Sequence, residues 1–126
     1  MKILVVEDQA IESKLAVHVL SAAGHDVSSA EAAEEALAAI KESHPNVILM
    51  DLSLPGVDGL TLVRKLKADP ATRDIHIVAV TSYPEKFSKE EALEAGCDAY
   101  LGKPLSTHTL PATLTDVVKN AERLDR

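Results

Sequence analysis

Residues 47 to 59 read VILMDLSLPGVDG, and this stretch decides the fold class. Four apolar residues, Val47–Met50, are followed directly by Asp51 and then by a turn that contains proline and glycine. A short, uninterrupted apolar run that ends in a turn is typical of a strand buried on both faces of a parallel sheet. Pro55 and Gly56 suit the turn, because proline presets φ and glycine tolerates positive φ. The stretch therefore predicts a buried strand that ends in a carboxylate.

Similar runs recur on both sides of this stretch and alternate with segments of helical periodicity. Further strands are expected at Ile3–Val6, Asp26–Ser29, Ile75–Val80 and Ala99–Leu101. Short strands that alternate with helices are typical of βαβ units around a parallel sheet. The chain has 126 residues, the length of about one domain. We therefore expect an α/β fold with five strands and five helices, and a single domain over residues 1–126 without an output domain.

Four of the expected helices carry an apolar stripe at helical spacing. The stripes consist of Ile11, Leu15 and Val19; of Ala33, Leu37 and Ile40; of Leu60, Val63 and Leu66; and of Leu110, Leu114, Val117 and Ala121. Each pattern predicts a helix that buries its stripe. The remaining helix is expected to begin with a capping box at Ser88 and Glu91 and to stop at Gly96. Pro111 favours a late start of the last helix, near Thr109.

Composition and charge exclude several classes of protein. The net charge is −7 and is spread along the chain, so the surface repels nucleic-acid backbones. The sequence has neither a polybasic run nor an apolar stretch near ~18 residues, so no membrane span or anchor is expected. The N-terminal MKILVVED carries acid too early for a signal peptide. Cys97 is the single cysteine, which suits a small buried residue in a reducing cytoplasm.

Polar residues follow four of the five expected strands. They are Glu7 and Asp8 after the first strand, Asp51 after the third, Thr81 after the fourth and Lys103 near the end of the fifth. In an open parallel sheet, ligands gather beyond the carboxyl ends of the strands. Taken singly, Asp8 can be explained as a helix cap, Asp51 as a turn residue and Lys103 as a surface charge. Together, the residues predict one polar site, and the uncharged end of the second strand fits an edge position.

The chemistry of these residues indicates a cation and a phosphoryl group. Three converging carboxylates repel one another, so the site is expected either to raise their pKa values or to bind a cation. Oxygen ligands without histidine or cysteine at metal-binding spacing favour Mg²⁺. With the carboxylates neutralised, Asp51 can attack a phosphoryl group, while Lys103 and Thr81 hold the developing oxyanions.

Over its whole length, the chain resembles the receiver domains of two-component response regulators. The resemblance rests on Glu7-Asp8, the segment MDLSLPGVDG around Asp51, Thr81, Tyr100 and Lys103-Pro104. It implies a doubly wound, five-stranded parallel sheet of order 2-1-3-4-5 with five helices, a flavodoxin-like three-layer sandwich. It also implies a stand-alone, chemotaxis-type receiver that promotes its own phosphoryl transfer and dephosphorylation, and that is not otherwise an enzyme.

The resemblance assigns roles to the site residues. Asp51 accepts a phosphoryl group from a histidine kinase or a histidine phosphotransfer protein, and Lys103 pairs with the phosphate. Mg²⁺ is held by Glu7, Asp8, Asp51 and the backbone carbonyl of Ser53. The Lys103-Pro104 peptide bond is expected to be cis.

The resemblance also implies a switch. The Thr81 hydroxyl binds the new phosphate and Tyr100 moves inward, which alters the face formed by the fourth helix, fifth strand and fifth helix. A target protein is expected to bind this face. Ser82, Pro84 and Pro111 depart from the commonest receiver pattern, so the shape of the face stays open. The cognate kinase, the target and a phosphorylation-dependent dimer stay open as well.

Other classes of protein explain the same residues less well. In a flavodoxin-like FMN carrier, Glu7-Asp8 would repel the flavin phosphate, and only three aromatic residues are present to flank the ring. An aspartate-nucleophile phosphatase usually has a second aspartate where this chain has Ser53. Neither glycine-rich nucleotide motif occurs. An interaction-only receiver that no longer takes phosphate is the third alternative, and nothing in the site residues favours it.

Overall fold

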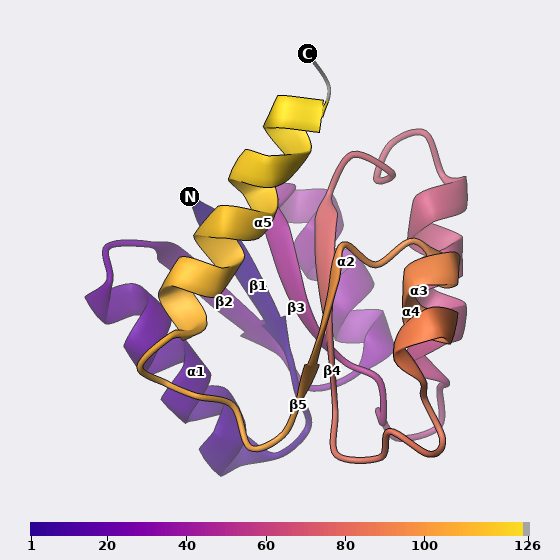
Figure 1. Ribbon diagram of the computed structural model, residues 1–126, viewed down its shortest axis with the longest axis horizontal. Helices are drawn as coiled ribbons and strands as arrows, with labels where there is room; N and C mark the ends of the chain where they lie inside the picture. Colours follow the sequence, from indigo (N-terminus) through magenta and orange to yellow (C-terminus); the bar gives the residue numbers. More distant parts are fainter. Residues whose placement is uncertain (125–126) are drawn as a thin grey trace.

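The computed structural model describes residues 1–124, with side chains up to residue 120. Its five strands are β1 (Lys2–Val6), β2 (Asp26–Ala30), β3 (Val47–Asp51), β4 (His76–Thr81) and β5 (Ala99–Gly102). They form one parallel sheet of order β2-β1-β3-β4-β5, with β2 at an edge (Figure 1). The expected fold is therefore confirmed, and each strand lies within one residue of its predicted bounds. Residues 125–126 of the expected domain lie outside the described chain.

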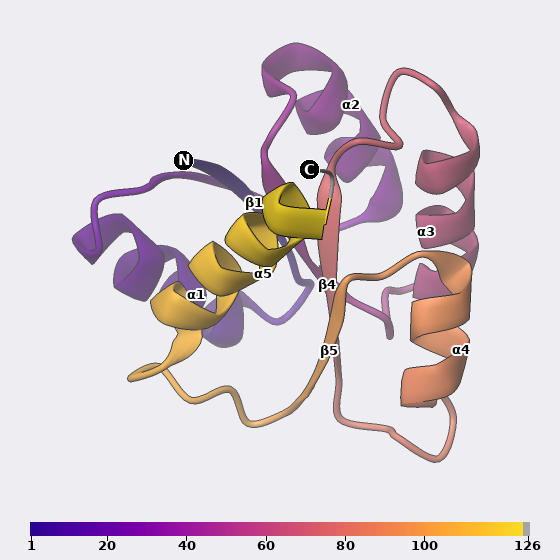
Figure 2. The same ribbon diagram turned by 45° about the horizontal axis from the view of Figure 1, so that its top comes forward.

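Five helices cover the two faces of the sheet. They are α1 (Ala10–Ala22), α2 (Ala33–Ser43), α3 (Gly59–Ala68), α4 (Lys89–Ala95) and α5 (Leu110–Leu124). Helices α1 and α5 lie on one face, and α2, α3 and α4 lie on the other (Figures 1 and 2). Within residues 1–124, no helix combines the length and the apolar character needed to cross a membrane.

The central strands are apolar throughout because both of their faces are covered. Leu4 and Val6 of β1 belong to the core beneath α2, α3 and α4. Their neighbours Ile3 and Val5 belong to the second core, beneath α1 and α5. Successive side chains of a strand point to opposite faces, so a strand between two helical layers needs apolar residues at every position. This explains the uninterrupted run at 47–50, which is fully buried.

Helix α1 buries a different face from the one predicted. Ile11 and Leu15 were expected in the core, but they are 84% and 50% exposed. The buried residues of α1 are Ser13, Ala16 and Leu20. Both sets have helical spacing, so periodicity alone does not choose between them. The small residues at 13 and 16 face the sheet, and Leu20 fills the core between α1 and α5.

The ends of α4 and α5 follow the sequence closely. The Ser88 side chain accepts a hydrogen bond from the Glu91 amide at 3.1 Å, but the Glu91 carboxylate contacts the Ser88 hydroxyl instead of its backbone amide. Only half of the predicted capping box therefore forms. Gly96 ends α4 with a φ of 116°. Helix α5 begins at Leu110, which confirms the late start. The side chain of Ala121 lies outside the described residues.

Candidate functional site

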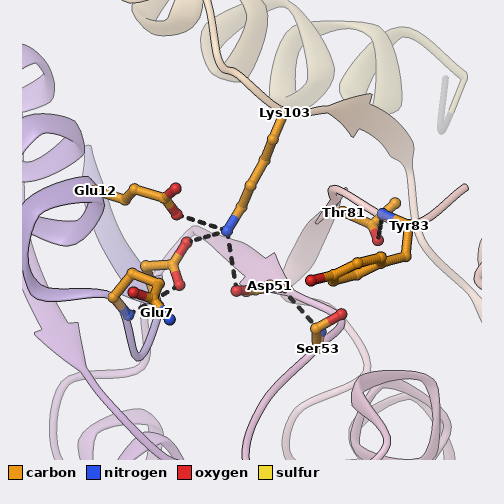
Figure 3. Close-up of polar contacts among 8 residues, drawn as sticks. Glu7, Glu12, Asp51, Ser53, Thr81, Tyr83 and Lys103 are labelled. Carbon is orange, nitrogen blue, oxygen red and sulfur yellow. Dashed lines mark hydrogen bonds and ion pairs between the residues drawn. The ribbon is translucent and has the colours of Figure 1, made fainter.

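The carboxyl ends of β1, β3 and β5 bring three predicted site residues into contact. Glu7 follows β1, Asp51 is the last residue of β3, and Lys103 follows β5. In Figure 3 the Lys103 side chain extends toward the two carboxylates from the opposite side of the site. The parallel register places the ends of these strands at one edge of the sheet, as the sequence predicted.

The ammonium group of Lys103 lies among three carboxylates. Its Nζ is 2.5 Å from Glu7 Oε1, 2.7 Å from Glu12 Oε2 and 3.1 Å from Asp51 Oδ2. An ammonium has three N–H donors, so each has an acceptor. The lysine thus joins α1, β1 and β3 to the segment after β5.

The sequence analysis missed Glu12. Its side chain comes from the first turn of α1 and not from the end of a strand. It stands four residues after Asp8, a spacing that places two side chains on the same side of a helix. This spacing was the only hint in the sequence that Glu12 could lie beside Asp8. The hint is weak, because α1 begins only at Ala10 and Asp8 precedes the helix.

Glu7, Asp8 and Asp51 form a cluster that could hold a metal ion. Each offers one carboxylate oxygen, and these oxygens lie within 4.8 Å of one another. Carboxylate oxygens without nitrogen or sulfur ligands suit a hard divalent cation such as Mg²⁺. The alternative explanation of Asp8 as a helix cap is wrong, because the N-cap residue of α1 is Gln9 and its side chain makes no cap.

The crowding of charges shifts the pKa values of the site. Burial, reinforced by the contact with Asp51, raises the pKa of Glu7 to about 8, although Lys103 opposes this shift. Burial alone would lower the pKa of Lys103, but its contacts with Glu12, Glu7 and Asp51 outweigh burial and raise it. The Lys103 ammonium in turn lowers the pKa of the Glu12 carboxyl. One firmly charged ammonium therefore faces three acidic side chains, and the crowding favours the protonated form of the buried Glu7.

A polar cleft of about 260 Å³ opens in front of Asp51. It is lined by Asp8, Gln9, Glu12, Asp51, Ser53, Ser82, Tyr83 and Lys103. Since a water molecule takes about 30 Å³, the cleft has room for a phosphoryl group and several waters. The half-exposed Tyr83 side chain, which the sequence analysis did not single out, extends from the end of β4 toward Asp51 and Ser53 (Figure 3).

A family model for the response regulator receiver domain matches residues 3–115 of the chain. The chain belongs to the response regulator receiver family. Membership separates this receiver from the flavodoxin-like FMN carriers that the sequence had left as an alternative. It also agrees with the strand order β2-β1-β3-β4-β5.

Relatives with known names and structures resemble this receiver over nearly its whole length. The polar-differentiation response regulator DivK of Brucella ovis is 34% identical over 119 residues, which cover 94% of this chain and 97% of DivK. The phosphate regulon regulatory protein PhoB of Pseudomonas aeruginosa is 38% identical over 93% of this chain, but the match spans only 51% of PhoB.

Solved receiver structures superpose closely on the fold. A CheY-like receiver domain protein from Methanospirillum hungatei has a TM-score of 0.88 at 28% identity, with 97% of this chain and 96% of that chain covered. The chemotaxis response regulator CheY4 of Vibrio cholerae has a TM-score of 0.81 at 31% identity, with 92% and 97% covered.

The loop after β3 fixes the Asp51 carboxylate of this receiver. The Ser53 amide donates a hydrogen bond to Asp51 Oδ1 at 2.9 Å. Gly56 takes a positive φ of 71°, as the turn requires. The loop closes where the Gly59 amide donates to the Leu52 carbonyl at 3.0 Å. A Cβ atom on Gly59 would lie 2.5 Å from Leu52 Cα, so only glycine permits this closure.

Neither Thr81 nor Tyr100 lines the cleft. Thr81 is fully buried, and its hydroxyl accepts a hydrogen bond from the Tyr83 amide at 2.9 Å. The partly buried Tyr100 donates its hydroxyl hydrogen to the Phe87 carbonyl. The Lys103-Pro104 peptide bond is cis. The switch roles of Thr81 and Tyr100 stay predictions.

Proposed function

We propose that this receiver is a phosphorylation-dependent signalling switch in which Asp51 accepts a phosphoryl group from a phosphohistidine. The donor is a histidine kinase or a histidine phosphotransfer protein. One observation carries the proposal: the buried Asp51 carboxylate faces a polar cleft, within a cluster of acids and 3.1 Å from the Lys103 ammonium. Membership of the receiver family supports phosphorylation-based signalling in general.

The transfer follows from the placement of Asp51 and Lys103. A carboxylate oxygen of Asp51 attacks the phosphorus, a new P–O bond forms, and the P–N bond to the donor imidazole breaks. Lys103 donates N–H groups to the oxygens of the transferred group, which stabilises their negative charge. Glu7, Asp8, Asp51 and the Ser53 carbonyl would hold Mg²⁺, which neutralises phosphoryl oxygens when it is bound. Hydrolysis of the acyl phosphate releases inorganic phosphate and restores the Asp51 carboxylate, so the chemistry proposed for this chain is its own phosphorylation and dephosphorylation.

The new phosphate brings about two negative charges to the end of β3. In the proposed switch, the Thr81 hydroxyl leaves the Tyr83 amide for the phosphate, and Tyr100 leaves the Phe87 carbonyl and moves inward. Both residues lie on β4 and β5, next to the surface formed by α4, β5 and α5. A target protein would read the altered surface.

The composition supports a cytoplasmic partner for this receiver. The net charge of −7 disfavours nucleic acid and anionic membrane surfaces as partners. The buried free thiol of Cys97 suits a reducing compartment. Protein–protein interaction is therefore the proposed output, with phosphorylation-dependent dimerisation as an option that depends on the target surface.

Acetyl phosphate provides a direct test of the acceptor. With Mg²⁺ present, we expect the wild-type chain to gain the mass of one phosphoryl group, which hydroxylamine then removes. Asp51→Asn should lose this gain because it lacks the attacking carboxylate. A full mass gain in Asp51→Asn would refute the assignment, and no gain in the wild type would favour the interaction-only alternative.

A further inference from the structure

Glu12 differs from the other two carboxylates that contact Lys103. The side chains of Glu7 and Asp51 are 8% and 5% exposed, whereas that of Glu12 is 51% exposed. Glu12 also lies outside the acidic cluster formed by Glu7, Asp8 and Asp51. It is thus an additional acid that holds the lysine from the solvent side of the cleft.

A phosphoryl group on Asp51 needs an N–H donor from Lys103, and all three donors are in use. Release of Glu7 would leave a buried side-chain oxygen, Oε1, without the hydrogen bond that Lys103 gives it, which is costly. Release of Glu12 exposes a carboxylate that water already reaches, and exposed ion pairs contribute little to stability. Glu12 is therefore the contact that Lys103 gives up most readily.

The contact between Glu12 and Lys103 also joins two parts of the fold. Both residues line the polar cleft and a neighbouring apolar pocket of about 120 Å³. The pocket lies between α1, which contributes Leu15, and the segment after β5, which contributes Leu105. The ion pair, which Figure 3 shows as a dashed line, thus belongs to the lining of both the cleft and the pocket.

We propose that Glu12 is a positioning residue that competes with the phosphoryl group for the Lys103 ammonium and so limits how readily the site takes up phosphate. The proposal rests on the proposed function, because it assumes that Asp51 is the acceptor. Glu12 acts through Lys103, so its effect must depend on the lysine. A carboxylate that merely repelled phosphate would act equally well without it.

The first test measures the lysine in the metal-free protein. In EDTA, an acetylating reagent modifies Lys103 at a rate that peptide mass spectrometry reports. Glu12→Gln removes the negative charge from one of the three acceptors of Lys103, so we expect Lys103 to react roughly two- to fivefold faster, the range typical of an exposed ion pair. Glu34→Gln is the matched control, since Glu34 is an exposed acid in the first turn of α2. An unchanged Lys103 rate in Glu12→Gln would refute the proposal.

The second test measures uptake of beryllofluoride, which mimics the phosphoryl group, by fluorine NMR in Mg²⁺. Glu12→Gln should lower the midpoint concentration by roughly two- to fivefold, while Glu34→Gln should match the wild type. When Lys103 is replaced by alanine, the further substitution Glu12→Gln should no longer lower the midpoint concentration. If Glu12→Gln lowers the midpoint equally in the Lys103→Ala variant, Glu12 acts only by charge repulsion and the positioning role is wrong.

The two ways of failing are distinguishable. If the wild type takes up beryllofluoride but Glu12→Gln has the same midpoint, this proposal alone is refuted. If the wild type takes up none, the proposed function fails as well.

Discussion

At the scale of single residues, one ammonium is shared among more carboxylates than it can neutralise. Lys103 contacts Glu7, Glu12 and Asp51, but no ion pair within 4.0 Å joins Asp8 to a cation in the described chain. Asp8 nonetheless offers an oxygen within 4.8 Å of the oxygens of Glu7 and Asp51. In the metal-free site, no direct ion pair within the described chain therefore offsets the repulsion on Asp8.

The substitution Asp8→Asn should stabilise the metal-free protein. Repulsion between two carboxylates at this distance costs about 1–4 kcal/mol, depending on the effective dielectric, and each 1 kcal/mol corresponds to a rise in melting temperature of about 4 °C for a domain of this size. Mg²⁺ should stabilise the wild type in a concentration-dependent way, and this response should weaken in the variant. Melting curves in EDTA and in excess Mg²⁺ measure both effects. An unchanged melting point in EDTA with a full Mg²⁺ response would show that these acids do not form one cation site.

Some residues of the site could be predicted from the sequence and others could not. Glu7, Asp51 and Lys103 were predictable because parallel strands end at one edge, so residues at strand ends meet. Glu12 comes from a helix, and Tyr83 from the loop after β4, where its orientation depends on packing. Neither Glu12 nor Tyr83 stands at the end of a strand, so the meeting of strand ends at one edge does not predict them. Contacts made by helix turns and loops need the three-dimensional structure.

At the scale of secondary structure, α1 shows where sequence periodicity stops being informative. Both the stripe with Ile11 and Leu15 and the stripe with Ala16 and Leu20 have helical spacing. The more apolar stripe was expected in the core, yet the structure exposes it. The choice is made by packing, because residues near the sheet must be small enough for the helix to approach it. The strands posed no such choice, since both of their faces are buried.

A matched pair of leucines on α1 tests this orientation. Leu20 is fully buried, so Leu20→Ala should lower the free energy of unfolding by about 2–5 kcal/mol through lost burial and a cavity. Leu15 is half exposed, so Leu15→Ala should cost less than about 1 kcal/mol. Urea unfolding of both variants provides the comparison. Equal losses, or a larger loss at Leu15, would contradict the observed orientation of α1.

At the scale of the whole molecule, the sheet connects the acceptor site to the proposed target surface. Lys103 follows directly after β5, which contains Tyr100, and β5 pairs with β4 through Thr81 and Gly102. The order of the strands came from the resemblance to receivers and not from periodicity, because apolar runs identify strands without saying which are neighbours. The structure confirms that order.

Lys103→Ala should weaken the coupling between the acceptor site at Asp51 and the proposed target surface. The variant should be less stable than the wild type, because two buried acids lose their contact with the ammonium. It should still fold in Mg²⁺, since the ammonium lies at the edge of the cleft and outside both apolar cores. On addition of beryllofluoride and Mg²⁺, the NMR shift changes of Tyr100 and α4 should be smaller than in the wild type, because the variant has no ammonium at position 103 to respond to the new charge. Lys119→Ala, at an exposed position of α5, is the control. Changes of wild-type size in Lys103→Ala would exclude a coupling role for the lysine.

The central claim is that Asp51 carries the phosphoryl group, and chemical trapping tests it most directly. Borohydride reduces an acyl phosphate to an alcohol, so a phosphorylated aspartate becomes homoserine, which peptide mass spectrometry locates. After treatment with acetyl phosphate and Mg²⁺, we predict homoserine at position 51, and none without acetyl phosphate. Homoserine at another acidic residue, with Asp51 unmodified, would contradict the account.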